Sequence, residues 1–551
     1  MSVRNEQCRC LIPECETAAS AIYRPPWLHV AVPVHDETPE TCSLFQRNTT
    51  GGGGGGGGGA GGGGGGGGDG TCPADLFDPT RTERCTAWVY EPGQRATIVD
   101  EWNITCDDNK WKLTLVGTIG YIGAFLGMPL AGFVSDRFGR KTLLAWAWVL
   151  ASLSGIVQSF STSLLMFLLF EFLDSFFEAG VYGAGFLLAL EFVGPRQRVL
   201  TTTVLSMFYS SGNALLGALA WAVRDWRWLL RAVYGGGLVF ALPLWFTPES
   251  VRWLATRGRL EEADAIVSKV AAINKVPVNE TLSSATRKAP LPGGEQLVEV
   301  PDDAAGAGTM RTLVSLFKSR TLALRFINCA YCWMANTFVY YGLSLNAVTL
   351  SGDEYVNFIL SGLVELPANL LSLWLQDYVG RRWTLAGTLI VSGVCCLAFL
   401  GVPAGGSGSP LPHYLPMDLT LLPGYSRTDE QWLQVALYML GKFAITISFI
   451  VIYVITAEMF PTNIRQSMVS YGSTFGRIGS ILAPQTPLLA TVSESLPLTL
   501  FGVVSLSSGL LAFLFPETKG RPLPETLDEA ERMGRAPGPC SCSPGTQEDG
   551  E

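Results

Sequence analysis

The chain has 551 residues, of which 48% are hydrophobic and 15% are charged, and its net charge is −9. Soluble chains usually carry about 25% charged residues, so this composition excludes an ordinary soluble protein. The acidic residues are scattered without any basic stripe, and the histidines and cysteines form no set with metal-ligand spacing. We therefore expect neither a nucleic-acid partner nor a metal or other cofactor.

Apolar stretches of roughly 20 residues recur along the chain, which is the length that an α-helix needs to cross a bilayer. They predict an all-α, multi-pass membrane protein. Short connections rich in Arg and Lys alternate with poorly charged ones, and the basic connections mark the cytoplasmic side. The eleven candidate spans cover residues 113–134, 142–160, 163–190, 199–222, 229–247, 322–343, 356–376, 384–403, 434–456, 468–491 and 497–515.

Residues 1–111 precede the first candidate span, and the basic connections place them outside the cytoplasm. Asn48 and Asn103 begin glycosylation acceptor sequences of the kind found on exposed lumenal loops. The glycine tract at 51–68 predicts a flexible insert without chemistry. Four cysteines form an even set compatible with two disulfide bonds in an oxidising compartment, with free cysteines as the alternative and the pairing left open. These candidates are Cys42, Cys72, Cys85 and Cys106.

The remaining boundaries follow from the same pattern. Residues 112–247 contain five candidate spans and residues 321–515 contain six, which predicts two transmembrane halves. A cytoplasmic linker at 248–320 joins them, and its stretch RLEEADAIVSKVAAIN has the spacing of a short amphipathic helix. Residues 516–551 form a polar cytoplasmic tail.

Two charged turns share one pattern, GFVSDRFGRK at 132–141 and WLQDYVGRRW at 374–383. Each follows an apolar run at a corresponding place in its half, so we interpret them as one turn in two copies of an internal repeat. Parallel repeats of this kind are typical of a large class of transporters. The acid can cap a helix start and pair with an arginine of the opposite half, while the glycine permits a tight turn. Positive charge that only sets the topology is the alternative.

These motifs carry a resemblance to a known family. The turn at 132–141, PESVRWL at 248–254, AEMFPTNIRQ at 457–466 and PETKGRPLPETLDEAE at 516–531 resemble the solute carrier family of organic cation, organic anion and carnitine transporters. That family belongs to the major facilitator superfamily, and the resemblance covers about residues 72–531. We assign a gating role to the charged residues and turn glycines of these motifs and of the second turn at 374–383. They are Asp136, Arg137, Gly139, Arg140, Glu249, Arg252, Asp377, Gly380, Arg381, Glu458, Arg465 and Glu517.

The chain departs from the family in three places, one of which is Val251, where the family more usually has a proline. The family implies twelve spans in two six-helix halves, but residues 1–30 contain no sufficiently long apolar run, so we expect the first span to be absent. In the third candidate span the family usually has an arginine followed by Gln-Gly, whereas this chain has Glu171, Asp174 and Ser175. Ion coupling is therefore not transferred from relatives. Together with Glu178, the two acids recur at helical spacing and stack on one helical face.

Three further ionisable residues lie in candidate spans, where a charge costs about 2.5–3.5 kcal/mol and normally faces a cavity or a partner. Glu365 and Arg477 are expected to face a cavity, with a permanent ion pair between them as the alternative. Lys442 begins the apolar part of its helix, so it is a candidate for substrate binding or for extension to the membrane interface.

Aromatic side chains attract organic cations and stack on flat rings. Tyr182, Trp333, Tyr340 and Tyr341 are the candidates in the spans, with ordinary packing as the alternative. The resemblance implies that Tyr182 and Trp333 occupy pocket positions of the family.

The sequence therefore predicts a transporter, not an enzyme, that moves a small organic ion by alternating access. The plasma membrane is the expected location. The resemblance implies that anion and carnitine carriers tend to have an arginine at the position of Arg477, and a guanidinium can hold a carboxylate with two hydrogen bonds. An organic anion or a carnitine-like zwitterion is thus favoured. The alternatives are an organic cation transporter and a non-transporting receptor or orphan of the same fold. Substrate and membrane lipid are the expected partners, and the oligomeric state is left open.

Overall fold

The structure is a computed structural model, and it describes residues 8–17, 21–35, 38–48, 72–73, 76–91, 97–194, 197–275, 316–350, 352–402, 427–461, 464–493, 495–521, 524 and 526–533. Within these ranges, eleven helices of 17 to 33 residues coincide with the eleven candidate spans. They are α3 (Lys110–Phe138), α4 (Arg140–Gln158), α5 (Leu164–Phe192), α6 (Arg198–Val223), α7 (Trp226–Leu244), α12 (Arg320–Asn346), α13 (Glu354–Tyr378), α14 (Arg381–Leu400), α15 (Arg427–Met459), α16 (Arg465–Leu482) and α18 (Leu496–Ala512).

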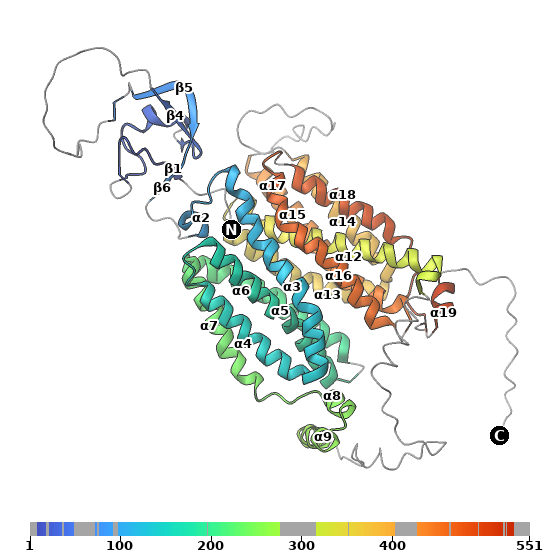
Figure 1. The fold of residues 1–551 in the computed structure, drawn as a ribbon. Helices are drawn as coiled ribbons and strands as arrows, with labels where there is room; N and C mark the ends of the chain where they lie inside the picture. The colour runs from blue at the N-terminus through green and yellow to red at the C-terminus, as the bar shows by residue number, and fades with distance from the viewer. Residues whose placement is uncertain are drawn as a thin grey trace, which may run out of the picture.

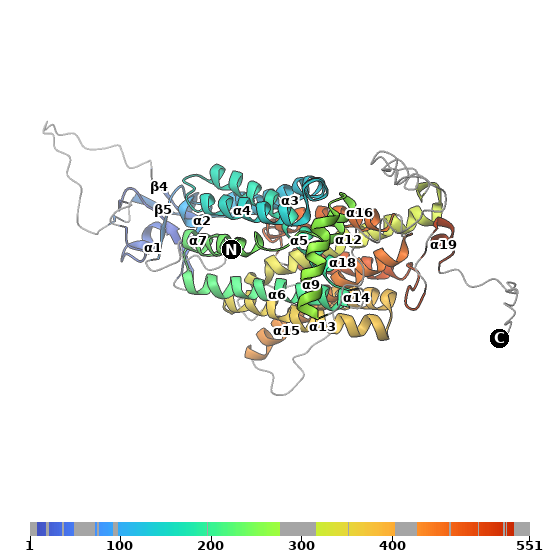
Figure 2. The ribbon, with the colours of Figure 1, turned by 90° about the horizontal axis from the view of Figure 1, so that it is seen from below.

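The long helices form two bundles that lie side by side. Figure 1 shows α3 to α7 in one bundle and α12 to α18 in the other, with the strands at one end and α9 at the opposite end. In the view from below, α3 and α16 lie along one side and α6 and α13 along the other (Figure 2). These two helix pairs connect the bundles, because α3 packs on α16 and α6 packs on α13.

Short elements complete the described chain. The amphipathic helix predicted in the linker is confirmed as α9, and α8 precedes it as a single extra turn. The short helices are α1 (Leu28–Ala31), α2 (Ile98–Glu101), α8 (Val251–Thr256), α9 (Leu260–Asn274), α17 (Thr486–Leu489) and α19 (Leu527–Arg532), with 3-10 turns η2 (Asp107–Asn109), η4 (Ala347–Thr349) and η6 (Ala483–Gln485).

Five of the described helices are long and apolar enough to cross a membrane by length and composition alone: α3, α4, α13, α14 and α15 from Trp432 onward. The others are shorter or interrupted by polar residues. For example, α5 carries Glu171, Asp174 and Glu178, and α18 has 17 residues. Because they pack beside the five apolar helices, their polar groups can face protein instead of lipid.

The two bundles differ in how they bury apolar side chains. The C-terminal half has one continuous core that includes Phe338, Phe460 and Phe501. In the N-terminal half, separate small clusters form around Phe167 and around Leu144. The matching turns pair α3 with α13 and α7 with α18, and this correspondence leaves α12 without a counterpart among the described residues of the N-terminal half. Since α12 packs on α15, α16 and α18, the continuous core depends on this central helix.

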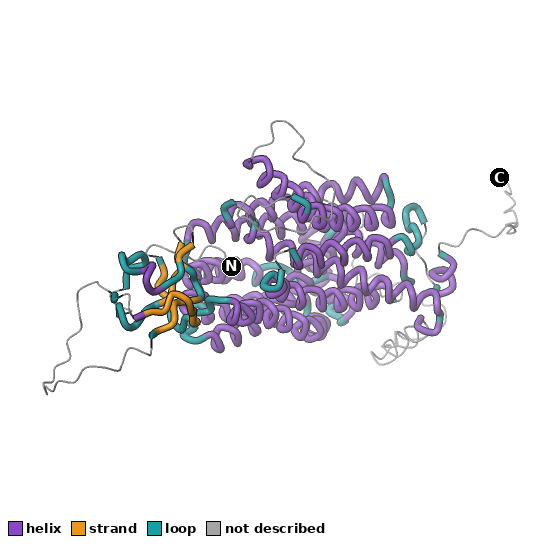
Figure 3. The backbone as a smooth tube through the Cα atoms, turned by 90° about the horizontal axis from the view of Figure 1, so that it is seen from above, coloured by secondary structure: helices purple, strands orange, loops and turns teal. Residues whose placement is uncertain are grey.

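Residues before α3 form a small domain of strands at one end of the bundles (Figure 3). Its three antiparallel pairs are β1 (Cys8–Cys10) with β6 (Trp88–Tyr90), β2 (Val34–His35) with β3 (Thr38–Pro39), and β4 (Ser43–Arg47) with β5 (Phe77–Arg84). The described helices of this domain, α1 and α2, have four residues each. The expected absence of a first span stays a prediction.

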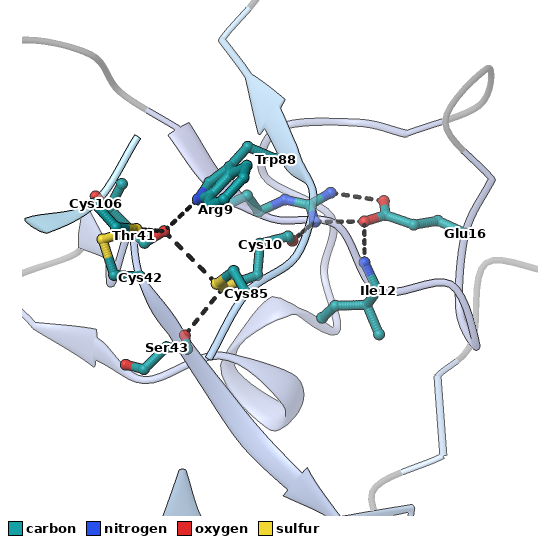
Figure 4. The surroundings of a disulfide bond; sticks show 10 residues. All are labelled: Arg9, Cys10, Ile12, Glu16, Thr41, Cys42, Ser43, Cys85, Trp88 and Cys106. Carbon is teal, nitrogen blue, oxygen red and sulfur yellow. Dashed lines mark hydrogen bonds and ion pairs between the residues drawn. A yellow bond between two sulfur atoms is a disulfide. The ribbon is translucent and has the colours of Figure 1, made fainter. Parts of the chain in front are cut away.

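Three disulfide bonds hold this domain together, which corrects the expectation of two. Cys42 bonds to Cys106, but Cys85 bonds to Cys10 and Cys72 to Cys15. The two additional cysteines lie in the first strand and the turn after it, which fold back on β6 and thereby approach their partners. The Thr41 carbonyl accepts a hydrogen bond from the Trp88 indole at 2.9 Å between two of the disulfides (Figure 4).

A buried arginine connects several segments of the same domain by hydrogen bonds. Arg9 is fully buried, and its guanidinium donates to the Glu16 carboxylate and, at 2.8 Å, to the carbonyl oxygens of Tyr23 and Cys10. The acceptor residues Asn48 and Asn103 are both exposed. Their glycosylation stays a prediction.

Candidate functional site

The charged turn of the N-terminal half is closed by a glutamate from a distant segment. Gly139 ends α3 with a φ of 106°, in the region that favours glycine, and α4 begins at the next residue. The Glu249 carboxylate accepts a hydrogen bond from the Lys141 backbone amide at 3.0 Å. A Cβ at Gly139 would collide with this carboxylate. An anion thus caps the positive end of α4.

The second turn repeats this arrangement. Gly380 has a φ of 101°, and the Glu517 carboxylate accepts from the amides of Arg381 and Arg382 at 2.9 and 3.2 Å, at the start of α14. A Cβ at Gly380 would lie 2.7 Å from Glu517 Oε2. Both copies of the repeat therefore use the glutamate that follows their last long helix as a helix cap.

The acids of the turns pair within their own turn and not across the halves as we had expected. Asp136 lies 3.0 Å from Arg140, and Asp377 lies 3.9 Å from Arg381. The physical reason is the i, i+4 spacing, which brings the carboxylate back to the arginine after the glycine. Each half therefore has its own ion pair within the turn, and no described ion pair of these acids joins the halves.

The two turns differ in the contacts of the arginine. Arg381 Nε lies 3.3 Å from Glu458 Oε2, and Thr518 donates to the same carboxylate oxygen at 2.6 Å. At the corresponding place in the N-terminal half, Glu191 Oε2 has no hydrogen-bond partner within the described chain, whereas the Nε atoms of Arg140 and Arg381 both lack one there. The other predicted gating residues make no ion pair with a described residue; these are Arg137, Arg252 and Arg465.

Glu365 lies at the middle of α13, where three side chains converge on its buried carboxylate. The ammonium of Lys442 on α15 lies 2.9 Å from Oε1, and the Tyr340 hydroxyl donates to the same oxygen at 2.8 Å. The Ser210 hydroxyl, on α6 of the opposite half, donates to Oε2 at 2.8 Å. Asn369 donates to the Ser210 oxygen at 3.2 Å. This network joins the two halves at mid-membrane depth.

Lys442 does not extend to the membrane interface. It is fully buried, donates to Ser344 Oγ at 2.6 Å, and its Nζ lies 3.4 Å from the centre of the Tyr340 ring. The alternative of extension to the interface is therefore wrong, because Lys442 lies ten residues inside the apolar stretch that begins at Trp432. Glu365 consequently pairs with this lysine and not with Arg477.

Arg477 is half-buried on α16 and forms no hydrogen bond or ion pair with a described residue. Its charge interacts electrostatically with Glu178, on α5 of the opposite half. Glu178 is exposed although it lies in the middle of its helix. An exposed carboxylate at that depth belongs in a water-accessible space between the halves and not against lipid.

Tyrosines surround the same space. Tyr121 of α3 meets Tyr341 of α12 across the halves at 5.2 Å between ring centroids, and Tyr341 meets Tyr340 at 5.2 Å. Tyr182 is 54% exposed, one helical turn after Glu178, and packs on Tyr209 at 6.2 Å. Of the aromatic candidates, the tyrosines therefore lie in the same region as Arg477 and Glu178.

Trp333 lies elsewhere, in the packed interior of the C-terminal half. It is 1% exposed, and its indole donates to Thr456 at 3.0 Å. Cys332 and Cys329, beside it on α12, are buried thiols without a disulfide.

Sequence reasoning missed Tyr121, Tyr209 and Ser210. Tyr121 stands among glycines in GTIGYIGAFLG, and Ser210 follows an aromatic residue in FYSSGN. A large or polar residue surrounded by small ones in a span was the available signal, because small neighbours let another helix approach.

The halves touch at a predicted outer end and again one turn from Glu365. A Cβ at Gly117 of α3 would lie 2.9 Å from Pro484, and one at Gly362 of α13 would lie 2.9 Å from the Ala214 backbone nitrogen. Thr114 donates to Gln485 at 3.3 Å in the first of these contacts. In the described chain, every hydrogen bond between the halves involves Thr114, Thr118 or Ser210 of the N-terminal half. The site is thus closed toward the outside.

Comparison with known proteins defines the class. The family described as "Sugar (and other) transporter" matches residues 89–529. The inward-open xylose transporter XylE from E. coli has the same fold, with a TM-score of 0.54, 17% identity, and coverage of 76% of this chain and 90% of that one. The chain is therefore a transporter of the major facilitator superfamily and not an enzyme.

Sequence relatives narrow this class. The chain is 33% identical to the organic cation transporter protein of Drosophila melanogaster over 85% of this chain and 80% of the relative. It is 30% identical to organic cation/carnitine transporter 2 of Homo sapiens, over 95% and 86%. It is 32% identical to solute carrier family 22 member 6-A of Xenopus laevis, over 83% and 76%. The chain belongs to this solute carrier family, as its motifs predicted.

Proposed function

We propose that this chain carries a small organic zwitterion, or a carboxylate-bearing organic anion, across the plasma membrane by alternating access. The observation that carries the proposal is the arrangement of charges at mid-membrane depth. Glu365 is neutralised by Lys442 at 2.9 Å, whereas Arg477 and Glu178 interact electrostatically from opposite halves without an ion pair to a described residue.

Arg477 and Glu178 suit a ligand with both charges. A guanidinium presents five donors in a fixed fork and holds a carboxylate with two parallel hydrogen bonds. Glu178 and the ring faces of Tyr182 and Tyr341 attract an ammonium group. The relatives named organic cation transporter and organic cation/carnitine transporter 2 support a small organic ion as the substrate. A quaternary ammonium is the second candidate, because Glu178 and the tyrosines could hold it without Arg477.

Uptake measurements separate these candidates. Cells that express the chain are given three labelled probes: a monocarboxylate, a carnitine-like zwitterion and a quaternary ammonium. We expect uptake of the zwitterion and the carboxylate, and Arg477→Ala should abolish both. Arg521→Ala, an exposed arginine of the tail, is the matched control and should leave uptake unchanged. Uptake of the quaternary ammonium alone by the wild type would contradict the charge assignment.

The topology has its own test. We propose that residues before α3 face the outside, so Asn48 and Asn103 receive glycans, whereas Asn279 in the linker, outside the described residues, does not. Single Asn→Gln variants are treated with glycosidase and compared by gel mobility. A glycan at Asn279 would overturn this topology.

A further inference from the structure

The N-terminal half contains one buried and one half-buried carboxyl group that the proposed substrate site does not use. Glu171 and Asp174 lie one turn apart on α5 and contact the neighbouring helices of their own half. The Glu171 carboxylate accepts from the Gln158 side-chain amide of α4 at 2.6 Å. The Asp174 carboxylate accepts from the Tyr234 hydroxyl of α7 at 2.5 Å. Both donors are neutral.

Two acceptor atoms in this cluster have no hydrogen-bond partner among the described residues. They are Asp174 Oδ1 and Gln158 Oε1, and their side chains are 5% and 1% exposed. Buried polar atoms are almost always paired. Both atoms are acceptors, and a proton bound at Asp174 Oδ1 would turn one of them into a donor.

The surroundings provide no counter-charge for the cluster. No described lysine, arginine or histidine forms an ion pair with either carboxylate. Arg231 of α7 instead donates to Ser159 at 3.1 Å and stacks on Phe160. Tyr121 of α3 is the other titratable group that interacts with Glu171 from a packed helix. A buried charge without a cation is unfavourable, whereas a neutral carboxyl is tolerated.

The cluster also lies close to the substrate site. Glu178 is one turn further along α5, and its charge interacts both with Asp174 and with Arg477 of the opposite half. A proton at Asp174 therefore reduces the negative charge beside Glu178, which favours a bound carboxylate at Arg477.

We propose that Asp174, together with Glu171, forms a proton-binding site through which the chain couples substrate movement to a proton gradient. A hydronium ion in the space between the halves gives up one proton. The new O–H bond forms at the Asp174 carboxylate, water remains, and the proton leaves on the opposite side when the halves exchange access. The coupling rests on the proposed transport function, but the proton site itself does not.

Infrared spectroscopy tests the site without a substrate. The purified full chain is titrated between about pH 6 and about pH 9, where exposed carboxyl groups stay ionised and tyrosines stay protonated. We expect a protonated-carboxyl band that titrates in this window and disappears in Asp174→Asn. Glu191→Gln, which removes a carboxyl from the other end of α5, should keep the band. Absence of a titrating band in the wild type, or its persistence in both Asp174→Asn and Glu171→Gln, would overturn the site.

Proteoliposome uptake tests the coupling. With one proton per substrate, an inward gradient of one pH unit can raise accumulation up to about tenfold. The wild type should show this gain, and Asp174→Asn should keep uptake at symmetric pH but lose the gain. Gradient-independent uptake by the wild type would refute the coupling. If the wild type carries no probe at all, the transport proposal fails, while the infrared result still decides the proton site.

Discussion

Glu365 of the C-terminal half meets the ammonium of Lys442 at 2.9 Å, whereas Asp174 and Glu171 of the N-terminal half meet only a hydroxyl and an amide. All three carboxyl groups lie inside a helix bundle. A carboxylate with its own cation is a fixed part of the structure, because either partner alone would be left charged and buried. A carboxylate with neutral donors can instead change its charge by binding a proton. The comparison thus separates a structural carboxylate from titratable ones.

The largest effect is expected from breaking the pair of the C-terminal half. Lys442→Met should lower the free energy of unfolding by about 3–5 kcal/mol, because it leaves Glu365 buried without a cation. Denaturation of the purified protein in micelles measures this loss. The double variant Lys442→Met/Glu365→Gln should recover much of it, since both charges are then removed. A loss below about 1 kcal/mol for the single variant would show that the pair is not needed.

The glutamates that cap the charged turns are a reference for this comparison, because the two halves have the same cap. Equal losses of stability are therefore expected in both halves. Glu517→Ala and Glu249→Ala should each cost about 1–2 kcal/mol, since each leaves amides unpaired at a helix start. The same denaturation assay, with hydrogen exchange at the first turns of α4 and α14, measures both. A loss confined to Glu517→Ala would mean that the turns are not equivalent.

Neutralising the acid of the N-terminal half should change stability far less. Asp174→Asn keeps an acceptor for the Tyr234 hydroxyl and removes a buried charge without a cation, so we expect a change within about 1 kcal/mol. Glu365→Gln, the matched variant, should be clearly more destabilising because Lys442 then remains charged. Equal losses for both variants would remove the distinction between the halves.

The smallest effect concerns a carboxyl group outside the membrane that also has only neutral donors. Partial burial raises the pKa of Asp100, against the opposing hydrogen bonds from Thr97. The folded state therefore binds this proton more tightly than the unfolded state, so its contribution to stability is present at low pH. That contribution falls as the pH rises from the ordinary aspartate pKa to the raised one. Thermal unfolding of Asp100→Asn across acidic pH should show a smaller decline than the wild type.

The sequence was sufficient for features that depend on neighbouring residues. The apolar runs predicted all eleven long helices, and the repeated motif predicted the two turns, because span length and turn chemistry are local. It was not sufficient for partners brought together by packing. Lys442 and Glu365 lie 77 positions apart on different helices, and they meet only because α15 packs on α13.

Two other contacts were missed for the same reason. The bonds of Cys10 and Cys15 depend on β1 folding back on β6. The contact of Ser210 with Glu365 joins residues 155 positions apart in opposite halves. No periodicity in either segment points to the other, so such partners require the tertiary arrangement.

The two glycine contacts between the halves have a mechanical consequence. Gly117 meets Pro484 beside α16, and Gly362 of α13 meets Ala214 of α6. The helix pairs α3 with α16 and α6 with α13 lie on opposite sides of the molecule (Figure 2), and two such points define a rotation axis. From Gly362 to the inner end of α13 at Tyr378 the lever arm is about 24 Å, at 1.5 Å per residue. A rotation of about 15° about this axis would displace the inner ends by roughly 6 Å while both contacts persist. Substituting either glycine by a larger residue should therefore restrict this rotation.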